Sequence, residues 1–122
     1  YGLANRAERI PFTENTAVEI GSNVKDFTKL AILQLVSKGK LNLSDPLTKF
    51  FENVPADKSS ITVAHLLDHT AGFRGALAPD QEKISREEMI KQMFAAPLIA
   101  APGKEENYSN PGYSFLAAII EI

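Results

Sequence analysis

The chain has 122 residues, of which 44% are hydrophobic and 23% are charged, and both fractions are ordinary for a globular protein. The formal net charge is −2, and lysines and arginines occur in ones and twos, so we expect neither a nucleic acid nor an anionic membrane surface as a partner. The absence of cysteine excludes disulfides, thiolate metal sites and cysteine nucleophiles. No apolar stretch approaches the ~18 residues that a membrane-spanning helix requires, so no transmembrane segment is expected.

The first part of the chain predicts little regular structure. Tyr1 to Asn5 is compatible with the tail of a strand, and a polar stretch with turn residues follows. Ala17 to Ile20 is predicted to be a short strand that ends at Gly21. The strongest helical pattern runs from Asn23 to Ser37. It is apolar on most sides, which predicts a buried, central helix.

Four further helices are predicted. They begin at Asp45, Thr62, Ser85 and Asn110, all of which are favoured N-cap residue types, and Ser85 also opens a capping-box pattern. The stretch from Phe73 to Lys83 is predicted to be the most exposed and irregular loop. These elements together predict a mostly α-helical chain with little strand.

Ser22 lies where the predicted strand meets the first helix. Lys25 follows three residues later, and residues at this spacing share a helix face, so the amine can lie near the hydroxyl. Serine becomes a good nucleophile only when a base takes its proton, and a lysine among apolar neighbours can be that base. The unpaired N–H groups of the first helical turn could stabilise a developing oxyanion.

The Ser-x-x-Lys spacing is weak by itself, because chance predicts roughly 0.6 matches in a chain of this composition. A second match, Ser37 and Lys40, lies at a helix C-terminus beside Gly39. Carbonyls rather than N–H groups are free there, so this match cannot form an oxyanion hole and is discarded. The alternative interpretation is that Ser22 is an ordinary N-cap and Lys25 a solvated surface residue.

Tyr108 and Asn110 form a second polar pattern directly before the last predicted helix. The Tyr108 phenol could relay a proton to a leaving group, and Asn110 could hydrogen-bond to substrate or to Lys25. The alternative for Tyr108 is a half-buried aromatic residue. Asn110 before Pro111 is also a good N-cap.

The two histidines, His65 and His69, are four residues apart, a spacing that could offer two zinc ligands on one helix. A metalloprotease motif requires Glu directly after the first histidine, and this chain has Leu66 there. No third ligand follows nearby. We therefore assign both histidines a structural role and expect no metal site.

In order and context, these motifs resemble the serine β-lactamase and penicillin-binding-protein family. The matching segments are Ile20 to Thr28, Ala31 to Val36, Gly39 to Pro46, Ile61 to Gly72, and Pro102-Gly103 followed by Tyr108 to Tyr113. A Tyr-x-Asn second motif points to the branch of class C β-lactamases, DD-carboxypeptidases and esterases, since the class A branch has Ser-Asp-Asn there.

The resemblance implies acyl transfer through an ester on Ser22. It assigns Ser22 as the nucleophile, Lys25 as the general base, Tyr108 as the second proton-transfer group and Asn110 as a substrate or network contact. The Ser22 backbone N–H is expected to be one half of the oxyanion hole. The implied substrate is a β-lactam, a D-Ala-D-Ala peptide or an ester. Neither a metal nor an organic cofactor is expected.

The family's third motif, Lys-Thr-Gly or His-x-Gly on a later strand, does not follow Tyr108. The His69-Thr70-Ala71-Gly72 segment imitates it but precedes Tyr108 and closes a helix. The expected fold is therefore the helical region plus the nucleophile helix of the α+β β-lactamase/DD-peptidase fold, with most of the sheet missing. Residues 1–122 would be a partial domain, truncated before the third motif and weak or inactive in isolation.

Two consequences follow from a partial domain of this family. A second chain, a dimer contact or the remainder of a larger protein is expected to cover the apolar face of the first helix. By resemblance alone, the protein is expected to be exported in a bacterium, whether periplasmic, envelope-associated or secreted.

Two other functional interpretations remain beside the hydrolase. One is a non-catalytic penicillin-binding-like protein that binds peptides or cell-wall material, and the other is an unrelated helical interaction domain. A binding protein would not need to keep Lys25 and Tyr108 together, and an unrelated domain would not show the motifs in the family's order. The hydrolase is therefore the favoured interpretation.

Overall fold

The computed structural model describes residues 2–76 and 84–122. Its elements are β1 (Leu3–Asn5), β2 (Ile10–Pro11), the 3₁₀ helix η1 (Gly21–Asn23), α1 (Val24–Ser37), the 3₁₀ helices η2 (Leu47–Lys49) and η3 (Ala56–Lys58), α2 (Val63–Leu67), α3 (Arg86–Ala95) and α4 (Asn110–Glu121). The expectation of a mostly helical chain with little strand is confirmed.

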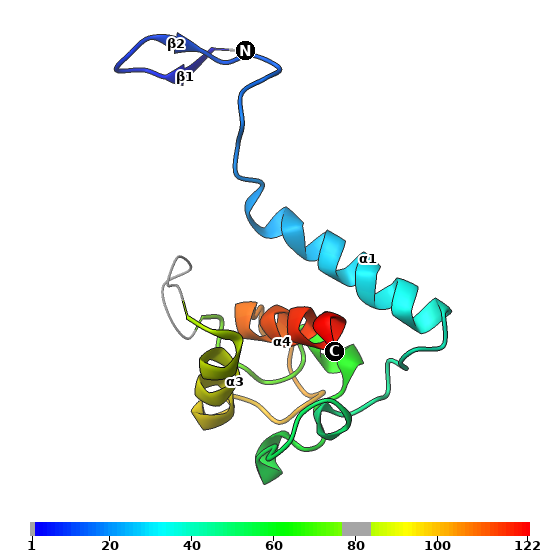
Figure 1. Ribbon diagram of the computed structural model, residues 1–122. Helices are drawn as coiled ribbons and strands as arrows, with labels where there is room; N and C mark the ends of the chain where they lie inside the picture. The colour runs from blue at the N-terminus through cyan, green and yellow to red at the C-terminus, as the bar shows by residue number, and fades with distance from the viewer. Residues whose placement is uncertain (1, 77–83) are drawn as a thin grey trace.

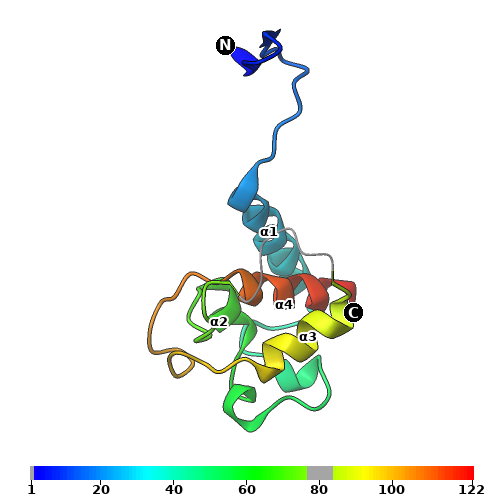
Figure 2. The same cartoon turned by 90° about the vertical axis from the view of Figure 1, so that its left-hand side faces the viewer.

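β1 and β2 form a two-stranded antiparallel hairpin. The hairpin stands apart from the helices, at the far end of an extended segment that leads into α1 (Figures 1 and 2). The prediction of a strand over Ala17 to Ile20 is wrong, because these residues lie in that extended segment without strand structure. A strand requires hydrogen bonds to a neighbouring strand, and in the described residues β1 and β2 pair only with each other.

α4 is the central helix of the described structure. It packs against α1, α2 and α3, and its Phe115 and Leu116 are fully buried. The Phe115 ring lies 5.4–5.6 Å from the rings of Phe51, Phe73 and Phe94, within the range of favourable aromatic pairs. Phe73 is thus part of the core, although it was predicted to begin an exposed loop; residues 77–83 of that loop lie outside the described residues.

α1 is not the buried central helix that its sequence predicted. Ile32 is its one buried residue, and this side chain joins the core beneath α4. A second set of its apolar side chains is 40–66% exposed, and we call this set the apolar stripe of α1: Val24, Phe27, Leu30 and Leu33. Apolarity on most sides of α1 therefore reflects one packed face and one face that the described residues leave uncovered.

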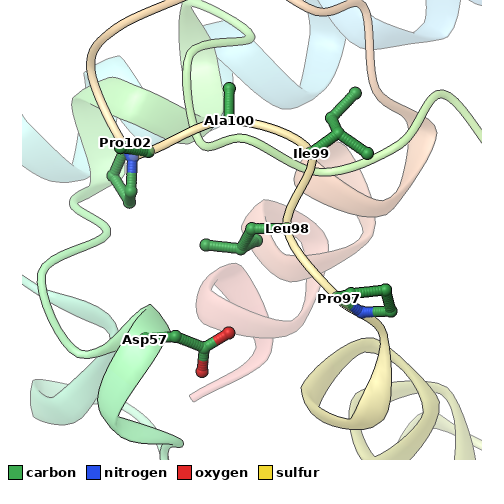
Figure 3. A pocket seen from close by; sticks show the side chains of 7 residues that line it. Asp57, Pro97, Leu98, Ile99, Ala100 and Pro102 are labelled. Carbon is green, nitrogen blue, oxygen red and sulfur yellow. The ribbon is translucent and has the colours of Figure 1, made fainter.

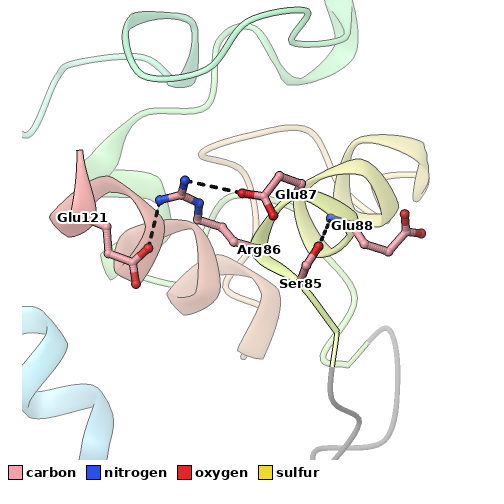
Figure 4. Close-up of polar contacts among 5 residues, drawn as sticks. All are labelled: Ser85, Arg86, Glu87, Glu88 and Glu121. Atoms are coloured by element: carbon pink, nitrogen blue, oxygen red, sulfur yellow. Dashed lines mark hydrogen bonds and ion pairs between the residues drawn. The ribbon is translucent and has the colours of Figure 1, made fainter.

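Helix caps explain where the later helices begin. Ser85 Oγ accepts a hydrogen bond from the Glu88 N–H at 3.2 Å and caps α3 as predicted (Figure 4). α4 is capped by Ser109, whose Oγ accepts from the Gly112 N–H at 3.1 Å. The prediction that Asn110 caps this helix is therefore wrong. Asn110 is the first helical residue, and its side chain serves another contact.

The helix predicted to begin at Asp45 is only the single 3₁₀ turn η2. The Asp45 carboxylate accepts from the Asn42 N–H at 2.8 Å and also pairs with Lys49. Asp45 thus closes the turn that precedes it instead of capping the helix that follows. Lys49 and the Asn42 N–H together lower the pKa of the Asp45 carboxyl, the lysine more strongly.

Two segments, one after α2 and one leading into α4, run side by side and are joined by backbone hydrogen bonds. We call residues 69–75 and 99–110 the paired segments. Carbonyls of the first accept from N–H groups of the second at 2.8–2.9 Å, in the pairs His69–Asn107, Thr70–Gly103, Gly72–Ile99 and Gly75–Asn110. Because the second segment ends at the start of α4, these bonds fix the position of Tyr108 and Asn110.

A shallow hollow lies at the other end of the second paired segment. Its walls come from residues 97–102 and from Asp57 (Figure 3). Leu98 and Ile99 point to opposite sides of the segment, and the buried Lys58 donates to the Asp57 carboxylate at 2.8 Å. None of the hollow's lining residues belongs to the two polar motifs.

Candidate active site

Ser22 and Lys25 lie on one continuous helical turn, because η1 leads directly into α1. Lys25 Nζ is 3.3 Å from Ser22 Oγ, the approach that the i, i+3 spacing predicts. Ser22 is exposed, whereas Lys25 is partly buried. The hydroxyl is therefore accessible to a ligand while the amine is confined beneath it.

The second polar pattern meets the first at the Ser22 hydroxyl. Tyr108 OH donates a hydrogen bond to Ser22 Oγ at 2.6 Å, and Lys25 Nζ donates to Asn110 Oδ1 at 2.8 Å. Residues more than 80 positions apart in the chain thus form one connected network. Because Ser109 caps α4, the Asn110 side chain is available for Lys25.

Two aromatic rings also surround the amine. Lys25 Nζ lies 4.9 Å from the ring centre of Tyr108 and 5.7 Å from that of Tyr113, within the distance for cation–π attraction. Tyr113, in the first turn of α4, donates through its hydroxyl to the Leu67 carbonyl at 3.1 Å. Burial is the main cause that raises the pKa of the Tyr113 hydroxyl, so it stays a neutral donor at physiological pH.

The contacts of His65 agree with the structural role predicted for the two histidines. His65 Nδ1 accepts from the Thr62 N–H while Thr62 Oγ1 accepts from the His65 N–H, both at 3.3 Å, and together they cap α2. His69 lies beyond the end of α2, with a φ of 58°. In residues 2–76 and 84–122, no group of three or more potential ligand side chains could hold a metal ion.

Known proteins resemble this chain in sequence and in structure. The β-lactamase family model matches residues 1–122. The chain belongs to the β-lactamase family. It is 33% identical over 129 residues to Protein flp of Staphylococcus aureus strain COL, covering 99% of this chain and 26% of that protein. The chain therefore spans about a quarter of the length of this relative.

Solved structures of β-lactamase-family proteins share the same fold. A penicillin-binding protein from Bacillus halodurans aligns with a TM-score of 0.80 and 34% identity, over 98% of this chain and 38% of its own. A β-lactamase/D-alanine carboxypeptidase from Pseudomonas syringae aligns with a TM-score of 0.80 and 27% identity, over 98% of this chain and 34% of its own. The relatives are hydrolases of the β-lactamase fold.

The structure brings together all four polar residues that the sequence singled out in this β-lactamase-family chain: Ser22, Lys25, Tyr108 and Asn110. It excludes Ser37, whose hydroxyl donates to the Gln34 carbonyl at the other end of α1. Sequence reasoning missed Tyr113 and the contacts of His69 with the site. Tyr113 follows Asn110 by three residues on α4, so the shared helix face was a local signal for it. His69 has no such signal, because it reaches Tyr108 across almost forty residues.

Within the residues that the structure describes, no helix has the length and apolar character needed to cross a membrane.

Proposed function

We propose that this chain carries the nucleophile and the proton-transfer groups of a serine hydrolase that works through an acyl-enzyme on Ser22. The observation that supports it most is that Ser22 Oγ lies within hydrogen-bond distance of two proton-transfer groups, Lys25 at 3.3 Å and Tyr108 at 2.6 Å. An ordinary N-cap serine would need neither. The residues of 1–122 would then be the part of the hydrolase domain that precedes the third motif.

In the proposed acylation, Lys25 in its neutral form takes the Ser22 proton as Oγ bonds to the substrate carbonyl carbon. A neutral amine keeps two N–H bonds, so Asn110 Oδ1 can hold Nζ in either protonation state. The resulting oxyanion would lie at the N-terminal end of η1 and α1, where backbone N–H groups, that of Ser22 first, lack intrahelical partners.

Collapse of this intermediate breaks the bond to the leaving group, and the proton that the leaving group requires passes through Tyr108. Water then bonds to the acyl carbon of the Ser22 ester and gives a proton to the same network. The bond between that carbon and Ser22 Oγ breaks, Oγ takes a proton back, and the acid is released. The protons exchanged with the leaving group and with water would thus pass through Lys25 and Tyr108, the two groups that contact Ser22 Oγ. No metal or organic cofactor is required by this sequence of steps.

The proposed substrate carries a carbonyl that can acylate serine. The names of the solved relatives, a penicillin-binding protein and a β-lactamase/D-alanine carboxypeptidase, favour a β-lactam or a D-alanyl peptide, and a simple ester would undergo the same chemistry. A substrate of the bacterial cell wall implies an exported protein, which we include in the proposal.

The experiment uses the full-length protein that contains this chain. The protein is incubated with a penicillin and, separately, with an activated phenyl ester, and the acylated peptide is identified by mass spectrometry. We expect the acyl group on Ser22 and no acylation in Ser22→Ala. The matched control is Ser37→Ala, which removes the other Ser-x-x-Lys serine and should acylate at the wild-type rate. Lys25→Met should slow acylation by about 10²–10⁴-fold, as loss of a general base does.

An acyl group found on any residue other than Ser22 would refute the proposal. So would a Lys25→Met variant that acylates normally. Saturable binding of either compound without acylation would instead support the penicillin-binding-like alternative that lacks catalysis.

A further inference from the structure

His69 touches the site without belonging to either polar motif. Its backbone has a φ of 58°, in the left-handed region that residues other than glycine seldom adopt. Its ring lies 4.6 Å from the ring of Tyr108 and 5.0 Å from that of Tyr113, with interplanar angles of 32° and 29°. The imidazole is thus in contact with both rings that flank the Lys25 amine.

The backbone on either side of Tyr108 is also bound to His69. The carbonyl of His69 accepts from the Asn107 N–H at 2.8 Å, and its Nδ1 accepts from the Ser109 N–H at 3.1 Å. The residues directly before and after Tyr108 are therefore both attached to this one histidine. Tyr108 is 52% exposed, and these contacts hold the backbone on both sides of it.

We propose that His69 is a positioning residue that holds the Tyr108 hydroxyl against Ser22. This inference rests on the proposed function, because it gives His69 an effect on acylation that passes through Tyr108. Its Nδ1 and its carbonyl hold the backbone on either side of Tyr108, and its ring lies against the Tyr108 ring.

The hydrogen bond from Ser109 requires an unprotonated Nδ1, so it assigns the ring proton of neutral His69 to Nε2. Burial, and then the charge of Lys25, lower the pKa of the His69 imidazole, which keeps this form at neutral pH. Charged and titratable groups from several elements surround the ring. Lys25 and Lys29 lie on α1, Glu106 and Tyr108 on the second paired segment, and Tyr113 on α4, and Asp68 directly precedes His69 in the chain.

Acidification should therefore release Tyr108. Because the folded-state pKa of His69 is lowered, the neutral ring persists below the usual value near 6.5 and is lost as the pH falls through the lowered pKa. Protonated Nδ1 would face the Ser109 N–H as a second donor, and the new positive charge would lie near Lys25. On the acid side of the pH profile, the acylation rate should then fall with the binding of one more proton in the wild type than in a variant that lacks the imidazole.

The test is a double-mutant cycle on the acylation rate of the full-length protein, with His69→Ala, Tyr108→Phe and the double variant. We expect His69→Ala to slow acylation by about 10–100-fold through misplacement of Tyr108. In the Tyr108→Phe background the same substitution should have an effect within about twofold, because residues that act through one group are not additive.

His69→Asn is the conservative variant. Asparagine tolerates a positive φ and can offer Oδ1 to the Ser109 N–H, but it has no ring and does not titrate. We expect it to recover part of the rate lost in His69→Ala and to lack the additional proton in the acid limb. His65→Ala is the matched control at the other histidine, and its folded form should acylate at the wild-type rate.

The outcomes separate the two proposals. Normal acylation by Tyr108→Phe would refute the role of Tyr108 in the proposed function, and the positioning role with it. A slow Tyr108→Phe combined with a full, multiplicative effect of His69→Ala would overturn only the role of His69. Circular dichroism checks that each variant is folded, and His69→Asn replaces His69→Ala in the cycle if the alanine variant does not fold.

Discussion

Gly72 offers a sharp test of how the paired segments hold the site. Its φ is 83°, it is buried, and a Cβ placed on it would lie 2.1 Å from the Ala100 carbonyl oxygen. Such contacts essentially never fall below 3.0 Å, so Gly72→Ala requires the two backbones to separate by at least 0.9 Å, the difference between 3.0 and 2.1 Å. The neighbouring bond from the Ile99 N–H to the Gly72 carbonyl, at 2.8 Å, lies in the path of that movement.

Two effects add in this variant. A left-handed backbone costs an alanine about 1 kcal/mol relative to glycine. Overpacking against a backbone atom, together with the weakening of the Ile99–Gly72 backbone hydrogen bond that it causes, adds at least about 2 kcal/mol. We therefore expect Gly72→Ala to lower the free energy of unfolding by about 3 kcal/mol or more, a large share of the ~5–15 kcal/mol typical of a domain.

Gly39 supplies the matched control for the backbone effect alone. It also has a positive φ, 65°, but a Cβ there would meet no atom within 4 Å. Urea denaturation of the full-length protein, followed by circular dichroism at 222 nm, should show Gly39→Ala destabilised by only about 1 kcal/mol. Equal losses in the two variants would refute the argument that the close approach to Ala100 makes Gly72 irreplaceable.

Three further predictions concern a cap, an ion pair and an exposed surface. Ser109→Ala should cost about 1–2 kcal/mol in urea denaturation through loss of the α4 cap, and an unchanged midpoint would contradict the assigned cap. Arg86→Ala should cost less than about 1 kcal/mol in the same assay, because Arg86 and its partner Glu121 are 46% and 61% exposed (Figure 4). The isolated 122-residue chain should self-associate in light scattering through the apolar stripe of α1, since large apolar patches are uncommon on monomers; a stable monomer that binds no hydrophobic dye would show that the stripe is not a contact surface.

The parts of the fold that sequence reasoning predicted best depend on local chemistry. Ser85 and Thr62 cap their helices because an N-cap needs only a side-chain oxygen within three residues of an N–H group. The approach of Lys25 to Ser22 likewise follows from helix geometry alone. These features require no knowledge of distant segments.

The parts that it missed depend on distant segments. Ser109 and Asn110 are both good N-cap residues, and the choice of Ser109 goes together with the contact between Asn110 and Lys25, 85 positions away. The predicted strand over Ala17 to Ile20 failed because a strand is defined by a partner that its own residues cannot supply. The contact of His69 with Tyr108 combines an unusual φ with a separation of almost forty residues, and no spacing rule covers it.

The paired segments also have a consequence for how this protein can change over time. The hydrogen bond from the Ile99 N–H to the Gly72 carbonyl holds together the two ends of a long chain segment. This segment, residues 73 to 98, includes α3, and we call it the excursion. Doubling the length of such a loop costs only about 0.6 kcal/mol in closure entropy, and the ends stay in place because their own hydrogen bonds hold them. Insertions, deletions and substitutions in the excursion can therefore accumulate without moving Tyr108 or Asn110, provided that they spare Gly75, whose carbonyl accepts from the Asn110 N–H, and the side chains that pack in the core, such as Phe73 and Met93. The geometry around Ser22 and the surface that the excursion presents can be selected independently, so a lineage could acquire new surroundings for its site while the spacing of the reacting groups is inherited unchanged.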